Sequence, residues 1–190
     1  MEKSALIMID MQRGFIDRRS PLCIPGAEAT ILPCAELIRR CHREGIPVIY
    51  AVRHYRADGS DVEKARREVW EKGGRPLSEC CDDAVSDAFP EEFELLPDDR
   101  VMIKPRFSAF FHTSLDLVLR RLGIERVLLA GTTTPNCIRT TCYDALSLDY
   151  DVTVVSDCTS SVTEQVQRQN LEDMARVGAR IASSAELFLL

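Results

Sequence analysis

The chain has 190 residues and a mass of 21.4 kDa, with 45% hydrophobic and 28% charged residues. This is the size and composition of one globular domain, which we expect to span residues 1–190. The formal net charge of −6, with no basic stretch, argues against a nucleic-acid partner, and no apolar run approaches the ~20 residues that a membrane-spanning helix requires.

The cysteine spacing and the N-terminal residues predict the cellular compartment of the protein. The eight cysteines lack the regular spacing of a secreted, disulfide-linked scaffold, so we expect reduced thiols. The apolar residues 4–9 are too few for a secretory signal and run directly into charged residues. We therefore expect a cytoplasmic protein with no membrane partner.

The first half of the chain begins with apolar segments that alternate with an amphipathic one. A strand predicted at residues 5–9 ends in Asp10. After a loop rich in Pro and Gly, the apolar spacing predicts a helix at 27–44, which a glycine ends. A second strand at 47–52 leads to His54.

A long excursion, residues 56–99, follows the second strand. It begins with a polar, exposed helix predicted at 61–72. Its irregular and acidic part, residues 77–99, is interpreted as part of a lid or as an oligomer contact.

The second half continues the alternation of strands and helices. A short strand at 101–103 ends in Lys104, and Thr113 with Asp116 three positions later predicts the capped start of the next helix. Further strands are predicted at 126–130, 151–155 and 179–182, and further helices from about 136 and at 164–177. Strands separated by amphipathic helices form parallel sheets covered on both faces. We therefore predict a three-layer α/β/α fold, Rossmann-like, with a mostly parallel six-stranded sheet.

Cys137 lies where the buried strand 126–130 turns sharply into a helix. Backbone N–H groups at such a turn face outward with the positive end of the helix dipole, which favours a thiolate and could hold an oxyanion. The alternative is that Cys137 only fills space, as buried cysteines commonly do.

Asp10, Lys104 and Cys137 all lie at the carboxyl ends of predicted strands. Ligands of open parallel sheets bind at this edge, so we expect the three side chains to meet there. Lys104 would favour the thiolate by its charge, and Asp10 could take the thiol proton and later activate water. Taken singly, Asp10 could instead be a loop or capping carboxylate, and Lys104 a solvated charge.

Three segments resemble the isochorismatase-like cysteine hydrolases, the superfamily of nicotinamidases, N-carbamoylsarcosine amidases and isochorismatases. They read LIMIDMQRGF, KPRFSAFFHTSLDLVLRRLGI and LLAGTTTPNCIRTTCYDALSLDYDVTVVSD. The resemblance implies that Asp10, Lys104 and Cys137 form a catalytic triad. It also implies a cis peptide between Thr132 and Thr133, an oxyanion hole formed by the N–H groups of Thr133 and Cys137, and a homo-oligomer, either a dimer or a tetramer.

The expected function is that of a cysteine hydrolase that cleaves a C–N bond, in an amide or carbamoyl group of a small molecule, through a thioester. One alternative is hydrolysis of a vinyl ether as in isochorismatases, where the resemblance implies a replaced cysteine. Another is a nucleotide- or flavin-binding module, although neither GxGxxG nor a P-loop is present. A third is a non-catalytic oligomeric scaffold.

No metal and no other cofactor is expected. Nicotinamidases resemble one another in an Asp-x-His metal motif after the second strand, where this chain reads RHYRADGSD and has few histidines. His54 either lines the substrate pocket or bonds to backbone. Arg106 and Arg139 flank the triad and could clamp a substrate carboxylate, with surface solvation as the alternative.

Overall fold

The computed structural model describes residues 3–82 and 85–188. Its centre is a six-stranded sheet in the order β3-β2-β1-β4-β5-β6, and every neighbouring pair of strands is parallel. The predicted α/β fold with a parallel sheet is confirmed. The strands are β1 (Ser4–Ile9), β2 (Val48–Val52), β3 (Arg100–Ile103), β4 (Arg126–Thr132), β5 (Asp151–Ser160) and β6 (Arg180–Ala182).

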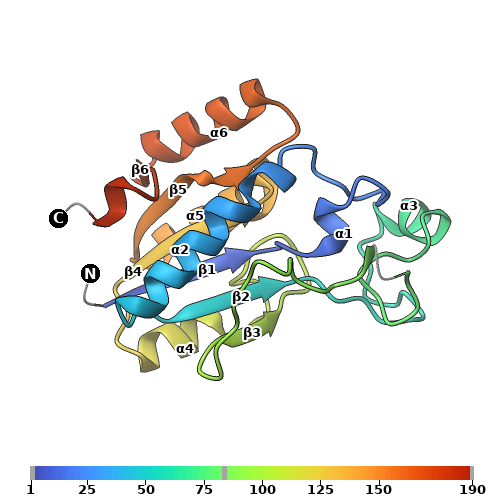
Figure 1. The fold of residues 1–190 in the computed structure, drawn as a ribbon, viewed down its shortest axis with the longest axis horizontal. Helices are drawn as coiled ribbons and strands as arrows, with labels where there is room; N and C mark the ends of the chain where they lie inside the picture. Colours follow the sequence, from blue (N-terminus) through green and yellow to red (C-terminus); the bar gives the residue numbers. More distant parts are fainter. Residues whose placement is uncertain (1–2, 83–84, 189–190) are drawn as a thin grey trace.

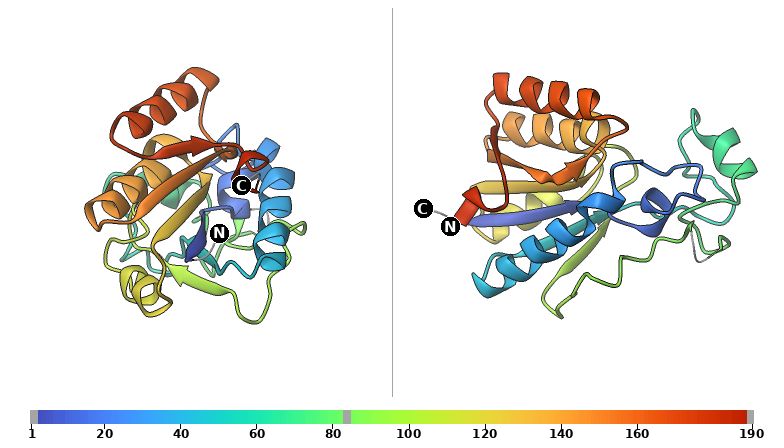
Figure 2. Two further views of the ribbon diagram at one scale, coloured as in Figure 1. Left: turned by 90° about the vertical axis from the view of Figure 1, so that its left-hand side faces the viewer. Right: turned by 45° about the horizontal axis from the view of Figure 1, so that its top comes forward.

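Helices cover both faces of this sheet, and Figure 2 shows α2 on one side and α4, α5 and α6 on the other. The α-helices are α1 (Arg13–Ile16), α2 (Ile31–Arg43), α3 (Arg67–Lys72), α4 (Leu115–Arg121), α5 (Arg139–Ser147) and α6 (Glu164–Arg176). The shorter helical segments are η1 (Glu28–Thr30), η3 (Thr134–Ile138) and η4 (Glu186–Phe188).

The alternation of side chains along the strands explains the two helical layers. In β1, Ile7 and Ile9 pack into the core beneath α4 and α5, whereas Leu6 and Met8 pack into the core beneath α2. All of β1 and β2 is buried, as expected for central parallel strands covered on both faces.

The carboxyl ends of the strands all lie at one end of the molecule, where Figure 1 also shows α1 and α3. Both chain termini lie at the opposite end. The chain moves outward from β1 to β2 and β3, and then crosses back to place β4 on the other side of β1. A crevice at the carboxyl ends of two such neighbouring strands is the usual ligand site of an open parallel sheet.

The excursion contains less helix than the sequence predicts, because α3 covers only Arg67–Lys72. The residues before it form turns held by their own side chains. Asp58 Oδ1 accepts the Ser60 N–H at 2.9 Å, Asp61 Oδ1 accepts the Arg56 N–H at 3.0 Å, and Gly59 has a φ of +67°. Asp side chains that bond to nearby backbone compete with helix formation in this way.

No helix within residues 3–82 or 85–188 is both long enough and apolar enough to cross a membrane.

Candidate active site

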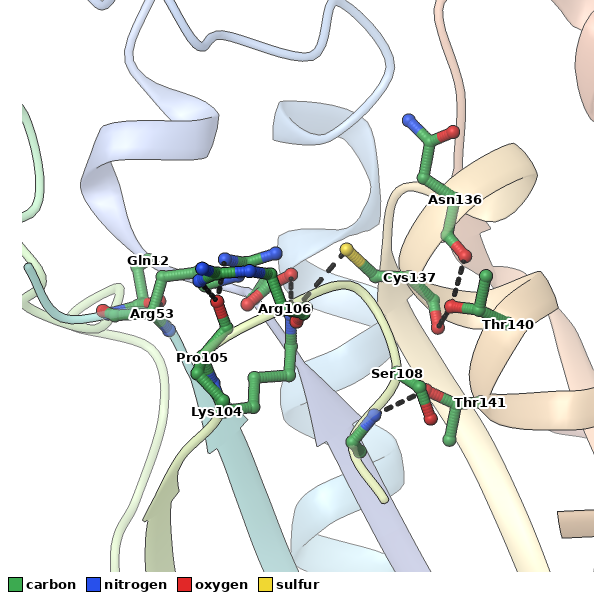
Figure 3. A network of polar contacts seen from close by, with 12 residues as sticks. Gln12, Arg53, Lys104, Pro105, Arg106, Ser108, Asn136, Cys137, Thr140 and Thr141 are labelled. Atoms are coloured by element: carbon green, nitrogen blue, oxygen red, sulfur yellow. Dashed lines mark hydrogen bonds and ion pairs between the residues drawn. The ribbon is translucent and has the colours of Figure 1, made fainter. Parts of the chain in front are cut away.

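Three side chains from three strand ends lie in contact at the carboxyl edge of the sheet. Asp10 directly follows β1, Lys104 directly follows β3, and Cys137 lies in η3 after β4. Lys104 Nζ is 2.7 Å from Asp10 Oδ2 and 3.5 Å from Cys137 Sγ, the second contact being visible in Figure 3. The structure thus brings together the three residues that the sequence analysis selected.

Asp10 is held by an unusual backbone conformation. Its φ is +53°, in the left-handed region that few residues other than glycine adopt. Its N–H donates to the Ala51 carbonyl at 3.0 Å, which extends the pairing of β1 with β2 by one residue. The chain therefore leaves the sheet abruptly at Asp10, which places the carboxylate over the strand ends.

The ion pair of Asp10 and Lys104 is almost completely buried, with side-chain exposures of 1% and 0%. Separating one partner from the other would leave a buried charge, which costs about 3–5 kcal/mol. Lys104 Nζ also donates to the Arg106 carbonyl at 3.2 Å. Asp10 Oδ1 accepts no hydrogen bond from the residues that the structure describes.

The surroundings of Cys137 favour the neutral thiol in the free protein. Burial raises the pKa of the Cys137 thiol to about 11, and the neighbouring Asp10 carboxylate acts in the same direction. Lys104 and Arg53 lower this pKa by less. The prediction of a readily ionised thiolate is therefore wrong for the free protein, because burial and the Asp10 carboxylate outweigh the charges of Lys104 and Arg53.

The turn that carries Cys137 is fastened to the neighbouring strand. The peptide bond between Thr132 and Thr133 is cis. The hydroxyls of Thr133 and Thr134 donate to the Ser160 carbonyl of β5 at 3.3 and 3.0 Å, and Ser160 Oγ donates to Thr132 Oγ1 at 2.9 Å. The extension of β5 beyond the predicted strand end thus holds the turn before Cys137 in position.

Asp10 and Cys137 line a small pocket of about 220 Å³, whereas Lys104 is buried behind them. At about 30 Å³ for each water, this space holds roughly seven water-sized groups, which is the scale of a small metabolite. One wall is apolar and comes from the segment after β1, and the opposite wall comes from the β4 turn. The lining residues are Asp10, Phe15, Pro21, Leu22, Cys23, Ile24, Arg66, Thr132, Thr133, Asn136 and Cys137.

A larger hollow of about 640 Å³ lies beside α1, away from this chemistry. Its rim is made of charged side chains that pair with one another, such as Arg18 and Glu28, whose closest N and O atoms are 2.8 Å apart. We place the candidate active site in the smaller pocket because only that one contains the thiol, the carboxylate and the β4 turn.

Arg53 is a buried residue that the sequence analysis did not select. Its side chain is 1% exposed, and Nη1 contacts Glu63 Oε1 at 2.5 Å and the Pro105 carbonyl at 3.0 Å. Gln12 holds its backbone, because Gln12 Oε1 accepts the Arg53 N–H and Gln12 Nε2 donates to the Arg53 carbonyl, both at 2.8 Å. The sequence signal for Arg53 is a cation at the end of β2, directly before His54.

His54 lies outside the pocket, contrary to the prediction that it lines it. Its Nδ1 is 2.7 Å from Asp87 Oδ2, and its Nε2 is 4.0 Å from Glu79 Oε1. Because the side chain turns toward the acidic excursion, it ties that segment to the end of β2. The alternative of a backbone bond is also wrong, since the partners of the imidazole are carboxylates.

Arg106 and Arg139 are also absent from the pocket lining. The interpretation that they clamp a substrate carboxylate is therefore not supported by their positions. Arg106 Nη1 donates to the Asp61 and Pro105 carbonyls at 3.1 and 2.6 Å; Figure 3 shows Arg106 and Arg53 against the same Pro105 oxygen. Arg139 points to α6, where Nη1 donates to Asn170 Oδ1 at 2.9 Å.

His54, Asp58 and Asp61, the candidate metal ligands after β2, bind other partners. Among residues 3–82 and 85–188, no three side chains of His, Cys, Asp or Glu are grouped so that they could hold a metal ion. His54 pairs with Asp87, whereas Asp58 and Asp61 bond to the backbone of their own loop. The site therefore does not fit a metal of the nicotinamidase type.

Comparison with known proteins places this chain in a family. The Isochorismatase domain model matches residues 4–186. A probable inactive nicotinamidase of Arabidopsis thaliana is 35% identical over 93% of this chain and 90% of its own length, and the maleamate amidohydrolase of Pseudomonas putida is 32% identical over 90% and 79%. The crystal structure of an isochorismatase family protein from Desulfovibrio vulgaris is similar with a TM-score of 0.90 and 38% identity, over 97% of this chain and 96% of that one.

Proposed function

Because the chain belongs to the isochorismatase family, we propose that it is a cysteine hydrolase that cleaves the C–N bond of a small-molecule amide or carbamoyl compound. A relative is named as an amidohydrolase of maleamate. The observation that carries the proposal is the contact of one buried ammonium with both a carboxylate and a thiol at the pocket floor.

In the proposed reaction, Asp10 removes the proton from Cys137 Sγ as the sulfur attacks the carbonyl carbon. The N–H groups of Thr133 and Cys137 stabilise the oxyanion that develops. Asp10 then protonates the nitrogen, the C–N bond breaks, and ammonia leaves a thioester on Cys137. Asp10 takes a proton from water, whose oxygen attacks the thioester, and the acid product departs as the thiol is restored.

The raised pKa of Cys137 is compatible with this scheme. A thiol that is neutral at rest needs a base nearby, and the Asp10 carboxylate, which pairs with the same Lys104 ammonium that contacts Cys137, is that base. The Lys104 ammonium, 2.7 Å from Asp10 Oδ2 and 3.5 Å from Cys137 Sγ, stabilises the negative charge of the thiolate as it forms. Lys104 thus balances one negative charge that moves between the oxygen and the sulfur.

The test is ammonia release from a panel of small primary amides and carbamoyl compounds. We expect Cys137→Ala to lower turnover by about 10⁴-fold or more, since removing a nucleophile removes the covalent route. Cys80→Ala, which changes an exposed thiol, serves as the matched control and should retain full activity. Rapid quenching should reveal an acyl group on the peptide that contains Cys137.

Two results would contradict the proposal. Turnover by Cys137→Ala within tenfold of the parent would exclude the cysteine route. A lack of ammonia from every compound would favour the non-catalytic alternative, which the name of the Arabidopsis thaliana relative keeps open.

A cytoplasmic location and a homo-oligomer, a dimer or a tetramer, complete the proposal. The excursion at 56–99 is the candidate contact between subunits. The exposed apolar residues Val101 and Ile103 of the edge strand β3, at 54% and 57% exposure, offer a second surface. Sedimentation velocity measures the state directly, and a monomer at all concentrations would contradict this part.

A further inference from the structure

One cation of the pocket has no anionic partner within the structure. Arg66 lines the pocket beside Asp10 and Cys137, although it comes from the excursion between β2 and β3. Its guanidinium carbon lies 5.2 Å from the centre of the Phe107 ring, so an aromatic face supports it. Within residues 3–82 and 85–188, the Arg66 side chain forms no hydrogen bond and no ion pair.

Two other cations near the pocket each form an ion pair with a carboxylate. Lys104 pairs with Asp10, and Arg53 pairs with Glu63 at 2.5 Å. Glu63 Oε2 accepts the Tyr55 hydroxyl at 2.7 Å, and among the described residues no ion pair joins Glu63 to Arg66. Although burial acts to raise the pKa of Glu63, Arg53 and Tyr55, with a smaller effect of Arg66, hold it below its ordinary value, so Glu63 carries a negative charge.

One positive charge therefore remains at the pocket, and it belongs to Arg66. Asp10 is the only acidic residue among those that line the pocket in the described part of the chain, and its charge is already matched. A single surplus positive charge favours a ligand with a single negative charge. A planar guanidinium matches a carboxylate in shape, since it can donate two parallel N–H bonds.

We propose that Arg66 binds a carboxylate of the substrate while the scissile carbonyl lies at Cys137. This inference rests on the proposed function and narrows it to small amides or carbamoyl compounds that carry a carboxylate. The apolar side chains of Phe15, Leu22 and Ile24 contact the carbon chain between the two groups. The pocket of about 220 Å³ restricts that chain to a few carbons.

The first test needs no substrate. Alkylation of Cys137 by iodoacetate, which carries a carboxylate, is compared with alkylation by neutral iodoacetamide, and peptide mass mapping follows the rates. We expect the rate ratio of iodoacetate to iodoacetamide at Cys137 to fall about 10-fold or more in Arg66→Ala, within the range of one charge-assisted hydrogen bond. Arg66→Lys should retain part of the preference.

Lys64→Ala is the matched control, because it removes the same charge from the same segment at an exposed position outside the pocket lining. Its ratio should equal that of the parent. Equal ratios in the parent and in Arg66→Ala would overturn the inference. A fall of equal size in Lys64→Ala would also overturn it, because a diffuse field rather than a binding contact would then be responsible.

The second test uses monoamides of three- to five-carbon dicarboxylic acids, each paired with the neutral amide that ends in a hydroxyl group. We expect the parent to prefer the acids in kcat/KM and Arg66→Ala to lose about 10- to 100-fold on the acids alone. Turnover of acids and neutral amides at equal rates would overturn the inference and leave the hydrolase proposal intact. A lowered alkylation ratio with no amide turnover would instead contradict the hydrolase proposal and support the anion site.

Discussion

The ammonium group of Lys104 lies between a carboxylate at 2.7 Å and a thiol at 3.5 Å, and it cannot serve both equally. Because Asp10 is the closer partner, the ammonium interacts more strongly with the carboxylate than with the thiol of Cys137. Burial then determines the resting state of the thiol, whose pKa lies near 11. The carboxylate, not a preformed thiolate, therefore starts the proposed reaction.

This arrangement predicts the pH dependence of alkylation of Cys137. In the parent, the rate with iodoacetamide should keep rising beyond pH 9, because the reactive thiolate accumulates only as the pH approaches the raised pKa of about 11. Asp10→Asn removes a charge that raises this pKa, so it should move the profile to lower pH. Stopped-flow alkylation between pH 6 and pH 11 measures the shift.

Lys104→Met should shift the alkylation profile of Cys137 in the direction opposite to Asp10→Asn. Since Lys104 lowers the pKa of Cys137, its loss should move the alkylation profile to higher pH. Circular dichroism must first show that the variant folds, because Asp10 is left buried without its partner. A profile with a plateau at pH 7 in the parent would contradict the account of both variants.

At the scale of elements, the β4 turn and the helix after it are held by contacts with their neighbours. Arg139 connects α5 to α6, since its Nη1 donates to Asn170 Oδ1 at 2.9 Å and lies 3.5 Å from Asp173 Oδ2. It also lies against the ring of Tyr143, 5.3 Å from its centre. These contacts make Arg139 a link between two helices.

Arg139→Ala should therefore lower stability without changing catalysis. We expect the free energy of unfolding in urea to fall by about 1 kcal/mol, as for the loss of a partly exposed charged hydrogen bond. The value of kcat/KM should stay within twofold of the parent. Arg168→Ala, which removes a more exposed cation from α6, is the control and should change neither quantity. A large rise in KM for Arg139→Ala would restore the substrate-clamp interpretation.

The convergence of Asp10, Lys104 and Cys137 could be predicted, because parallel strands place their carboxyl ends at one edge regardless of sequence separation. The position of Arg66 could not, since it depends on turns of the excursion that only their own hydrogen bonds define. The resting state of Cys137 was mispredicted because the sequence shows the charged neighbours of the thiol but not its complete burial, which raises its pKa most. Arg139 was misplaced because the spacing within a helix does not show which neighbour each face contacts.

At the scale of the whole molecule, several buried thiols should make the folded state less stable at alkaline pH. Burial raises the pKa of Cys41 and of Cys142 to about 12, and the pKa of Cys137 is raised to about 11. In the unfolded chain, where the pKa of a cysteine thiol is near 9, these thiols ionise at lower pH than in the folded protein. The folded state then binds more protons than the unfolded state, so stability is complete below pH 9 and declines as the pH rises through 9 toward 11 and 12.

We therefore expect the urea midpoint to be level between pH 7 and pH 8.5 and to fall steeply above pH 9. Each buried thiol should contribute a loss of about 1.4 kcal/mol per pH unit in that range. The double variant Cys41→Ala/Cys142→Ala should be less stable at pH 7 but should have a flatter profile above pH 9. Parallel profiles for the variant and the parent would show that other groups cause the alkaline loss.

The first part of the excursion between β2 and β3, which includes α3, lies beyond the carboxyl ends of the strands, and the chain then runs back along the sheet to β3 (Figure 1). It contributes Arg66 to the pocket wall, whereas the reacting groups sit on strand ends and on the β4 turn. We therefore expect the sequence of the excursion to diverge faster than that of the strand ends and the β4 turn. Insertions or substitutions in the excursion can exchange one substrate for another while the sheet preserves the chemistry. A mutant library that varies residues 56–76 but keeps Glu63 and the buried Val62 and Trp70 is accordingly where we expect new specificities to arise.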